Sequence, residues 1–531
     1  MARPMGQPKR IPGMPIPQLL TREPLVTSIL NKGMWTSVDP ADIDPGALVL
    51  AKNVDVRYDK TSRRAGWAKE AARHDANPID MLIEFRQGTT SILLVRLTRY
   101  SMATKPSLAG AWVAVTIGHT ERPINYAIIE GTLYFTTGSD IIQTWVFGAG
   151  ATVPASGNFV PAARFITGAA DRVVAASTGD TPLTRSTIYW SGNRNFQEFD
   201  GAVDISAGNA PLSISSSNNV DDIAGIFSFG NVVIIPRLFS IWQATRTYID
   251  TNPFNFYEAI PGVGCDVPRS IAIGENGLLF LSRNDKMIYL YRPGQAIQEV
   301  GVPIAVQATL ELGDAADVFS HYDRFQNEYI LGIKDGAGDA KAWKFNFRTP
   351  GWTYNEFELG SSIVPTAFST QEILSGFTSF DELIGTFDAL TGTFDELSAD
   401  PVRDQVLLLG DSDGYVWNED LTVDQDNSVD FDAVVQSKEF SFPQVDTLLN
   451  EIRIEYDGSM AGTYTLEYSK DGGTTWTTAK AGTVNASNRQ IIKFNKTVRA
   501  RRITWRLTAT DGRWDLLGYE VHVQRVGDSR K

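Results

Sequence analysis

Short apolar runs followed by turns recur along the chain from about residue 80. Each run leads through a turn into a second run that carries an aromatic residue. The runs are short and rich in β-branched or aromatic residues, which indicates β-strands rather than buried helices. The first runs occupy residues 92–95, 133–135, 173–175, 232–235, 278–281, 329–331 and 406–409, and the aromatics that answer them are Trp112, Trp145, Trp190, Trp242, Tyr289, Trp343 and Trp417.

These units repeat at a spacing of roughly 35–55 residues, close to the length of one propeller blade. One hairpin cannot bury both of its faces, whereas blades packed around a ring bury them against each other. The pattern therefore predicts an all-β protein with a β-propeller-like ring of about seven hairpin or blade units. A large β-sandwich has similar strand spacing and remains the alternative at this point.

The two ends of the chain differ from the repeat. Residues 1–45 are predicted to form an extended arm, either free or docked on a neighbouring subunit, and residues 46–430 to form the propeller-like domain. From residue 431 to 531 the strands alternate polar and apolar positions, which predicts a C-terminal antiparallel β-sandwich. The arm prediction depends on repeated prolines that disfavour helix, namely Pro4, Pro8, Pro12, Pro15 and Pro17.

A near-perfect heptad, Phe-Asp-x-Leu-x-Gly, forms an insertion at 377–400. Its aromatic residues Phe380, Phe387 and Phe394 are seven positions apart. Glycines within the repeat disfavour a coiled coil, so a series of tight turns is predicted, each capped by its Asp. The insertion is expected either to pack on the ring or to contact another subunit or partner.

The charge balance limits the function classes. Lys and Arg total 48 against 62 Asp and Glu, a net charge of −14. Tight phosphate binding needs a basic face, so tight or sequence-specific binding of nucleic acid is not expected, whereas a negative surface would let a duplex slide past without sticking. One cysteine and four scattered histidines predict neither a metal site nor a cofactor. No apolar run reaches about 18 residues, so no membrane span is predicted.

One turn motif stands out in the C-terminal region. Ser469, Asp471, Gly473 and Trp476 match the Asp-box of sialidases and related propellers. In this motif the Asp accepts backbone N–H groups across a hairpin, and the glycines permit positive φ. We interpret the match as a structural turn, because a glycosidase also needs paired carboxylates or the Tyr and arginine cluster of a sialidase.

The best basic patch is formed by Arg499, Arg501 and Arg502. It is interpreted first as a solvated strand edge that discourages sheet addition, and second as a contact for an acidic partner. Three nearby aromatics are candidates for sugar stacking or for the core, namely Trp505, Trp514 and Tyr519. No catalytic set is found, so a structural, non-enzymatic role is predicted.

Several motifs between residues 30 and 410 resemble tail proteins of short-tailed double-stranded DNA bacteriophages, a group that includes tail nozzle (tail tube) and packaged-DNA stabilisation proteins. The similar segments are Asn31-Lys-Gly-Met-Trp35, Asp39-Pro40, Pro45-Gly46-Ala47, Asn53-Val54, Arg63-Arg64-Ala-Gly-Trp67, Ile188-Tyr-Trp-Ser191 through Phe199, Pro253-Phe254, Gly262-Val-Gly-Cys265 with Ser270, and the Phe-Asp-x-Leu-x-Gly repeat. The resemblance covers most of residues 30–410, and it rests on the order of the motifs.

The resemblance implies a virion protein, assembled in the host cytoplasm, whose subunits form a homohexameric ring below the portal and adaptor proteins. The ring would retain and conduct the genomic DNA and support fibres or spikes. Two other functions remain open from the sequence: a receptor-binding or fibre-anchoring tail protein, and a sialidase-like glycosidase.

Overall fold

Strand dominates the molecule, as the hydrophobic pattern predicts. The computed structural model is 55% strand and 1% helical, which confirms the all-β class. It describes residues 24–57, 59–87, 91–106, 110–179, 181–212, 221–304, 318–334, 340–359, 363–375, 402–442, 447–485 and 489–525.

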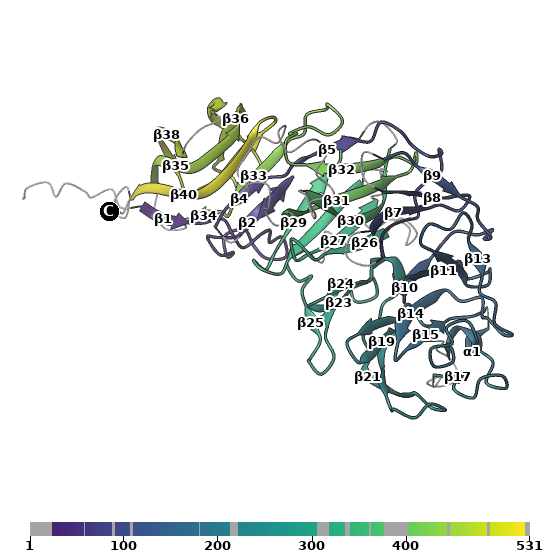
Figure 1. The fold of residues 1–531 in the computed structure, drawn as a ribbon. Helices are drawn as coiled ribbons and strands as arrows, with labels where there is room; N and C mark the ends of the chain where they lie inside the picture. Colours follow the sequence, from purple (N-terminus) through teal and green to yellow (C-terminus); the bar gives the residue numbers. More distant parts are fainter. Residues whose placement is uncertain are drawn as a thin grey trace, which may run out of the picture.

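Seven four-stranded antiparallel units follow one another in the described chain, and each is one blade of a propeller (Figure 1). Blades 1 to 3 consist of β6 (Met81–Gln87), β7 (Ser91–Leu97), β8 (Met102–Lys105) and β9 (Val113–Val115); β10 (Asn125–Ile129), β11 (Thr132–Thr136), β12 (Gln143–Val146) and β13 (Val153–Pro154); and β14 (Phe165–Ala169), β15 (Arg172–Ala176), β16 (Thr187–Trp190) and β17 (Gly208–Pro211).

Blades 4 to 7 have the same meander. They consist of β18 (Phe227–Phe229), β19 (Val232–Pro236), β20 (Ser240–Arg246) and β21 (Phe254–Pro261); β22 (Ala272–Gly274), β23 (Gly277–Ser282), β24 (Met287–Tyr291) and β25 (Gln298–Glu299); β26 (Val318–Asp323), β27 (Glu328–Lys334), β28 (Ala340–Asn346) and β29 (Gly351–Glu356); and β30 (Pro365–Ser375), β31 (Val402–Asp411), β32 (Val416–Asp420) and β5 (Gly66–Lys69). Two short helical turns, α1 (Pro182–Arg185) and η1 (Pro268–Ser270), lie between strands.

The predicted apolar runs are the second strands of the seven blades, and six of the seven aromatics lie on the third strands. These strands face neighbouring blades on both sides, so they carry the strongest hydrophobic signal. The first strands line the centre of the ring.

The ring is closed by a strand from the beginning of the chain. β5 is the outermost strand of blade 7 and pairs with β32, so that Gly66 lies opposite Asp420 and Lys69 opposite Trp417. Between blades 7 and 1, Leu82 and Leu94 pack against Leu408. A buried apolar cluster of this kind lies at each of the seven blade-to-blade contacts.

The C-terminal domain is a sandwich of two sheets, built from both ends of the chain. One sheet has the order β3–β4–β40–β35–β38, with β1 added beside β40, and the other continues from β29 through β2, β33, β39 and β36 to β37. The strands are β1 (Pro24–Ser28), β2 (Leu48–Lys52), β3 (Val54–Val56), β4 (Thr61–Arg63), β33 (Ala433–Ser437), β34 (Phe440–Ser441), β35 (Thr447–Met460), β36 (Gly462–Ser469), β37 (Thr477–Val484), β38 (Arg489–Ala500), β39 (Arg502–Ala509) and β40 (Arg513–Arg525).

Two predicted boundaries need correction. Residues 46–63, assigned to the propeller, lie instead in the sandwich sheets, and the propeller begins at β5. Within the predicted arm, residues 24–28 form β1 and pair with β40. Local patterning does not show which distant sheet a short strand joins, so the sequence pattern assigns these strands to the domain of their neighbours in the chain. Residues 1–23 and the insertion at 377–400 lie outside the described residues.

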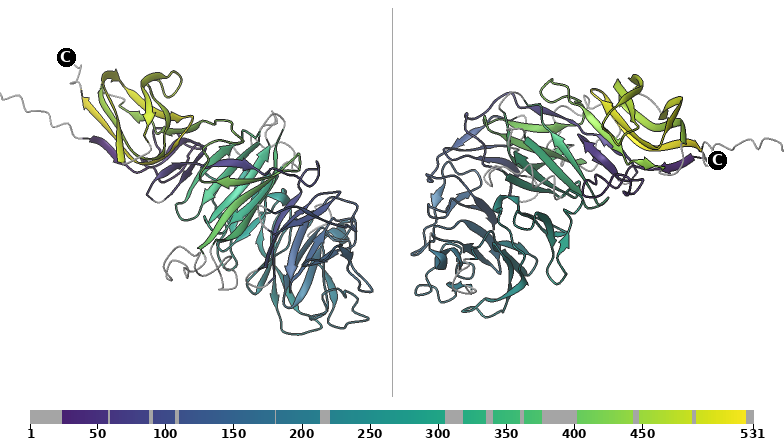
Figure 2. Two further views of the ribbon diagram at one scale, coloured as in Figure 1. Left: turned by 45° about the horizontal axis from the view of Figure 1, so that its top comes forward. Right: turned by 180° about the vertical axis from the view of Figure 1, so that it is seen from behind.

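Propeller and sandwich share backbone pairing and a core. Lys52 of β2 lies opposite Tyr354 of β29 in a parallel bridge, so blade 6 continues into a sheet of the sandwich. One hydrophobic cluster includes Leu281 of blade 5, Trp343 of blade 6 and Trp505 of the sandwich. Figure 2 shows the sandwich extending from one side of the ring.

Ring packing can be tested at Leu409, which is fully buried between blades 6 and 7. We expect Leu409→Ala to lower the free energy of unfolding by about 2–5 kcal/mol, because it removes buried methyl groups and leaves a cavity. Denaturant unfolding followed by tryptophan fluorescence measures the loss. Leu421→Ala, at a position that is 62% exposed, is the matched control and should change stability by less than about 0.5 kcal/mol. Equal losses in the two variants would contradict the closed ring.

Candidate functional site

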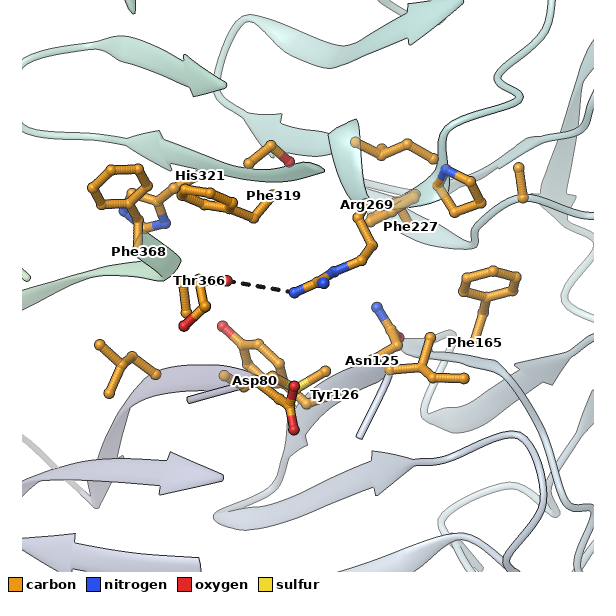
Figure 3. A pocket seen from close by; sticks show the side chains of 18 residues that line it. Asp80, Asn125, Tyr126, Phe165, Phe227, Arg269, Phe319, His321, Thr366 and Phe368 are labelled. Atoms are coloured by element: carbon orange, nitrogen blue, oxygen red, sulfur yellow. Dashed lines mark hydrogen bonds between the residues drawn. The ribbon is translucent and has the colours of Figure 1, made fainter. Parts of the chain in front are cut away.

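The first strands of the seven blades meet around a central cavity of about 180 Å³ (Figure 3). This volume is below the ~300–1,000 Å³ of ordinary ligand pockets. The blades contribute mainly apolar and aromatic side chains to its wall, among them Met81, Tyr126, Phe165, Phe227, Ile271, Phe319 and Phe368. The centre of the ring is therefore largely filled by side chains.

Polar groups bridge the centre of the ring. The Arg269 guanidinium extends from blade 5 and donates to the carbonyl oxygen of Thr366 in blade 7, 3.4 Å away. Asp80 accepts a hydrogen bond from Arg122, and burial raises the pKa of its carboxyl. Burial also lowers the pKa of His321 to about 4, so its imidazole is neutral at pH 7. The first contact joins blade 5 to blade 7, and the second joins the neighbouring blades 1 and 2.

The junction between propeller and sandwich contains two consecutive buried arginines. Arg63 is fully buried and donates to four backbone carbonyls, of Asp424, Phe431, Thr510 and Gly512, at 2.7–2.9 Å. Burial lowers its pKa to about 10, so it remains charged at pH 7. The Arg63 side chain thereby joins the linker that follows blade 7, at Asp424 and Phe431, to the turn between β39 and β40, at Thr510 and Gly512.

Arg64 forms a bidentate pair with Asp426. Its two terminal nitrogens lie 2.8 and 2.5 Å from the carboxylate oxygens, and both side chains are fully buried. Asp426 also accepts the backbone N–H groups of Trp67 and Glu358, each at 3.1 Å. The carboxylate is thus satisfied on all sides, as a buried charge requires.

One aromatic ring packs against both guanidinium groups. The Arg63 and Arg64 guanidinium carbons lie 4.1 and 3.6 Å from the centre of the Phe431 ring. Such cation–π contacts are strongest where water is excluded. Arginine suits both positions because its planar fork donates in fixed directions, which lysine cannot do.

A second ionic cluster lies beside this junction, around a cavity of about 220 Å³. Lys344 of blade 6 contacts Asp55 of β3 at 2.6 Å and Glu328 of β27 at 3.4 Å. Asp323 and Glu419 face the same group. Burial disfavours charge on Lys344, but the surrounding carboxylates raise its pKa.

The carboxylates of this cluster differ in their titration. Burial opposes ionisation of Asp55, yet Lys344 and Arg57 lower the pKa of its carboxyl. Burial raises the pKa of Glu419 to about 7, with Asp55, Glu328 and Asp323 adding repulsion and Lys344 opposing the rise. At pH 7 the Glu419 carboxyl is therefore protonated in some molecules and ionised in the others.

The structure places the predicted Asp-box at the tip of the β36–β37 hairpin in the sandwich. Asp471 accepts the Thr475 N–H at 2.9 Å and the Ser469 hydroxyl at 2.7 Å, while the Ser469 oxygen accepts the Gly473 N–H at 2.8 Å. Gly473 has a φ of +90°, and hydrogen bonds led by that from the Thr475 hydroxyl lower the pKa of Asp471 to about 2. Trp476 stacks on Arg506, whose guanidinium carbon is 4.2 Å from the ring. The geometry is that of a structural turn.

The candidate sugar-stacking aromatics all lie in the sandwich core. Trp505, Trp514 and Tyr519 are at most 2% exposed, and Tyr519 donates to the carbonyl oxygen of Pro45 at 2.7 Å. A sugar cannot reach these rings in the folded sandwich. Cys265 is also fully buried, and burial raises the pKa of its thiol to about 12.

Arg499, Arg501 and Arg502 are brought together where β38 turns into β39, and all three are exposed. Arg502 lies 3.5 Å from Glu439. Phe380, Phe387 and Phe394 lie outside the described residues.

In the sequence, the only signal at the junction arginines is the family resemblance. Two adjacent arginines in a short strand are usually solvent-facing, and nothing local points to Asp426, which is more than 350 positions away. Lys344 gave no signal at all, because isolated lysines are common on surfaces.

Neither a metal-binding cluster nor a membrane-spanning helix is present in the described part of the chain. No group of three or more His, Cys, Asp or Glu residues there is arranged to hold a metal ion. No helix in that part is long and apolar enough to cross a membrane.

No protein-family model matches the chain, and no curated protein matches it either. Among solved structures it is similar to the WD40 repeats of RRP9 (10% identity over 58% of this chain and 88% of that one, TM-score 0.37). It is also similar to YCF48 from Cyanidioschyzon merolae (11% identity, 67% and 98%, TM-score 0.37) and to the computationally designed Ika8 protein (11% identity, 66% and 99%, TM-score 0.36). The propeller class follows from the seven blades and their closure.

Loss of the buried pair is expected to be costly. Arg64→Met leaves Asp426 buried without its cation and should lower the free energy of unfolding by about 3–5 kcal/mol. Arg246→Met is the control, since it breaks a 3.1 Å pair with Asp171 that is partly exposed and worth less than about 1 kcal/mol. Denaturant unfolding measures both. Adding Asp426→Leu to Arg64→Met should recover part of the loss, and no recovery would contradict this account of the pair.

Glu419 should contribute a loss of stability as pH rises from about 4.3 to 7, opposite in sign to the gain that His321 contributes up to about pH 6.5. The folded carboxyl holds its proton up to about pH 7, whereas the unfolded one releases it near pH 4.3. Between these values the folded state binds more protons, so ionisation favours unfolding by up to about 1.4 kcal/mol per pH unit. Glu419→Gln should remove this contribution and make the slope of stability against pH more positive than in the parent chain, in unfolding measured from pH 5 to 8. Glu299→Gln, an exposed carboxylate on β25, should not, and an unchanged slope in Glu419→Gln would reject the assignment.

Proposed function

We propose that this protein is a structural virion subunit, a tail nozzle or hub protein of a short-tailed double-stranded DNA bacteriophage. In this proposal its copies form a homohexameric channel that retains and conducts the genome. The channel sits below the portal and adaptor proteins and supports fibres or spikes. The protein has no catalytic role of its own.

The observation that carries the proposal is the buried junction. The residues through which the chain resembles the phage proteins include Arg63, Arg64 and Trp67, and these are the residues that join propeller to sandwich. Met34, in another similar segment, is fully buried in the shared core and forms a bridge with Leu48. The resemblance thus falls on groups that make two domains into one rigid unit, which suits a component under mechanical load.

The size of the central cavity determines where DNA would pass. A cavity of about 180 Å³ has room for a few water molecules and none for a duplex. A genome channel must therefore be formed between several copies. The net charge of −14 agrees with this role, because a negative surface repels phosphate and lets DNA slide without adhering.

The two alternatives have less support. The receptor-binding function relied on Trp505, Trp514 and Tyr519, which are core residues. The glycosidase alternative relied on the propeller repeat together with the Asp-box, and the Asp-box is a hairpin turn in the sandwich rather than part of the propeller. The buried junction favours the structural role, because it joins the propeller and the sandwich into one rigid unit.

The oligomeric state tests the proposal directly. Mass photometry of the full chain is expected to show a species of about six times 58.4 kDa. Negative-stain microscopy should show a ring with an opening wide enough for a duplex. Mass photometry should be repeated over a range of concentrations, with the purified chain alone. A monomer at every concentration, or glycan release by the purified chain, would contradict the proposal.

A further inference from the structure

Lys344 places a buried primary amine at the junction between the propeller and the sandwich. It lies on β28 of blade 6, and its side chain is 7% exposed. Ile330, opposite it on β27, and Ala342, two positions earlier, belong to the apolar cluster between blades 6 and 7. The amine therefore lies next to an apolar layer, and burial there disfavours its charged form.

The carboxylate of Asp55 is in direct contact with this amine. Nζ of Lys344 lies 2.6 Å from Oδ1 of Asp55, whose side chain is 10% exposed. The two residues are 289 positions apart in the chain, and Asp55 lies on β3 of the sandwich. The carboxyl carbon is one covalent bond beyond Oδ1, so the amine is close to the separation of roughly 3–3.5 Å from which nucleophilic attack starts.

A second buried carboxyl lies beside the pair. Oε2 of Glu328, on β27, is 3.4 Å from the same Nζ, and the Glu328 side chain is 7% exposed. Its other oxygen accepts a hydrogen bond from the Asn346 side-chain N–H at 2.9 Å, which holds the carboxyl in place. Burial raises the pKa of Glu328, against the opposing charge of Lys344. A positioned carboxyl with a raised pKa is suited to giving and taking protons near neutral pH.

We propose that Lys344 and Asp55 condense into an intramolecular isopeptide bond, with Glu328 relaying the protons. The amine, the carboxyl and the relay come from β28, β3 and β27, so they meet only in the folded chain. The reaction therefore follows folding. Its product joins blade 6 covalently to the sandwich.

The reaction balances without a co-reactant. A proton first passes from the Lys344 ammonium to the Asp55 carboxylate, which leaves a neutral amine and a neutral carboxyl. The lone pair of Nζ then attacks Cγ of Asp55, and the π electrons of the C=O bond move onto its oxygen. Glu328 gives a proton to the leaving hydroxyl and takes one from the nitrogen, so the C=O bond reforms and one water leaves. Nothing is oxidised or reduced.

Fixed geometry and burial favour this condensation, which is unfavourable between free side chains in water. Holding two reacting groups in contact gives an effective concentration that reaches the order of 10⁵–10⁸ M. The neutral amide also removes the cost of burying an ammonium and a carboxylate, while the net charge of the cluster stays the same. The adjoining cavity of about 220 Å³, lined by Asp55, Glu328 and Lys344, receives the released water.

The charges around Lys344 determine the pace of the reaction. The surrounding carboxylates raise its pKa, so the neutral amine is a minor species at pH 7. Condensation requires that neutral form, because only a free lone pair is nucleophilic. The bond is therefore expected to accumulate slowly after folding.

The chain contains a matched pair that is not expected to react. Nζ of Lys60 also lies 2.6 Å from a carboxylate oxygen, that of Asp515, but the two side chains are 32% and 31% exposed. Water solvates both charges there, so transfer of a proton to form the neutral pair is less favourable than in a buried site. Lys60 should remain a free amine.

Mass spectrometry of the purified full chain tests the bond directly. After several days at neutral pH, the intact chain should be lighter than its sequence mass by one water molecule. Trypsin should release residues 53–57 joined to residues 342–348, because it does not cleave after an acylated lysine, whereas cleavage after Lys60 should be normal. A folded chain that keeps its full mass and is cleaved after Lys344 would overturn the proposal.

Three variants separate the roles of these side chains. Lys344→Arg keeps a cation beside Asp55 but has no nucleophilic amine, so it should keep its full mass. Glu328→Gln keeps the size of the relay but not its titrating proton, and it should slow bond formation at least about tenfold. Lys60→Arg is the matched control and should form the bond at the parent's rate.

Circular dichroism shows whether each variant is folded, and the linked peptide identifies the partners. A fragment that joins Lys344 to Glu328 rather than to Asp55 would overturn the pairing. Bond formation in folded Glu328→Gln at the parent's rate would overturn the relay.

The denatured chain gives a second readout. The bond closes a loop between positions 55 and 344, so the reacted parent should migrate differently from Lys344→Arg in a denaturing gel with reductant. Identical migration would contradict the bond. Neither readout depends on the oligomeric state, so a negative result leaves the proposed channel function untouched.

Discussion

The buried pair of Arg64 and Asp426 is the constraint on which the arrangement of the two domains depends. The chain leaves the sandwich after β4, which ends at Arg63, and enters the ring at β5, which begins at Gly66. It returns between β32 and β33, and Asp426 lies in that return. The pair therefore joins the segment through which the chain enters the propeller to the segment through which it returns to the sandwich. A charge so deeply buried requires complete pairing, so neither crossing can shift without leaving an unpaired ion.

The ring and the sandwich are consequently one mechanical body. β5 closes the propeller with residues from the start of the chain, and β2 to β4 bind the same stretch into the sandwich. The backbone pairing of β2 with β29 and the shared core around Trp343 extend that connection. The central cavity of about 180 Å³ is lined by side chains from all seven blades of the described chain.

Charge is distributed unevenly over this body. The chain as a whole is acidic, yet positive charge collects on β38, and the Lys344 cluster buries several carboxylates around one ammonium group. The cations on β38 include exposed side chains, whose interactions solvent screens. The Lys344 cluster is buried, so the protonation of its carboxylates is coupled to folding.

The sequence by itself determined the strand content, the number of blades, the C-terminal sandwich and the Asp-box turn. Each of these depends on interactions within a few residues or on a repeat that local burial imposes, so the periodicity of apolar residues reveals them. Only the tertiary structure decided that residues 46–63 belong to the sandwich, that β5 closes the ring and that Arg63 and Arg64 are buried. These features depend on partners hundreds of positions away, among them Asp426, Thr510 and Gly512. A short strand or an arginine has the same local pattern whether it is exposed or buried, because the folded chain alone supplies the carbonyls and carboxylates that make its burial possible.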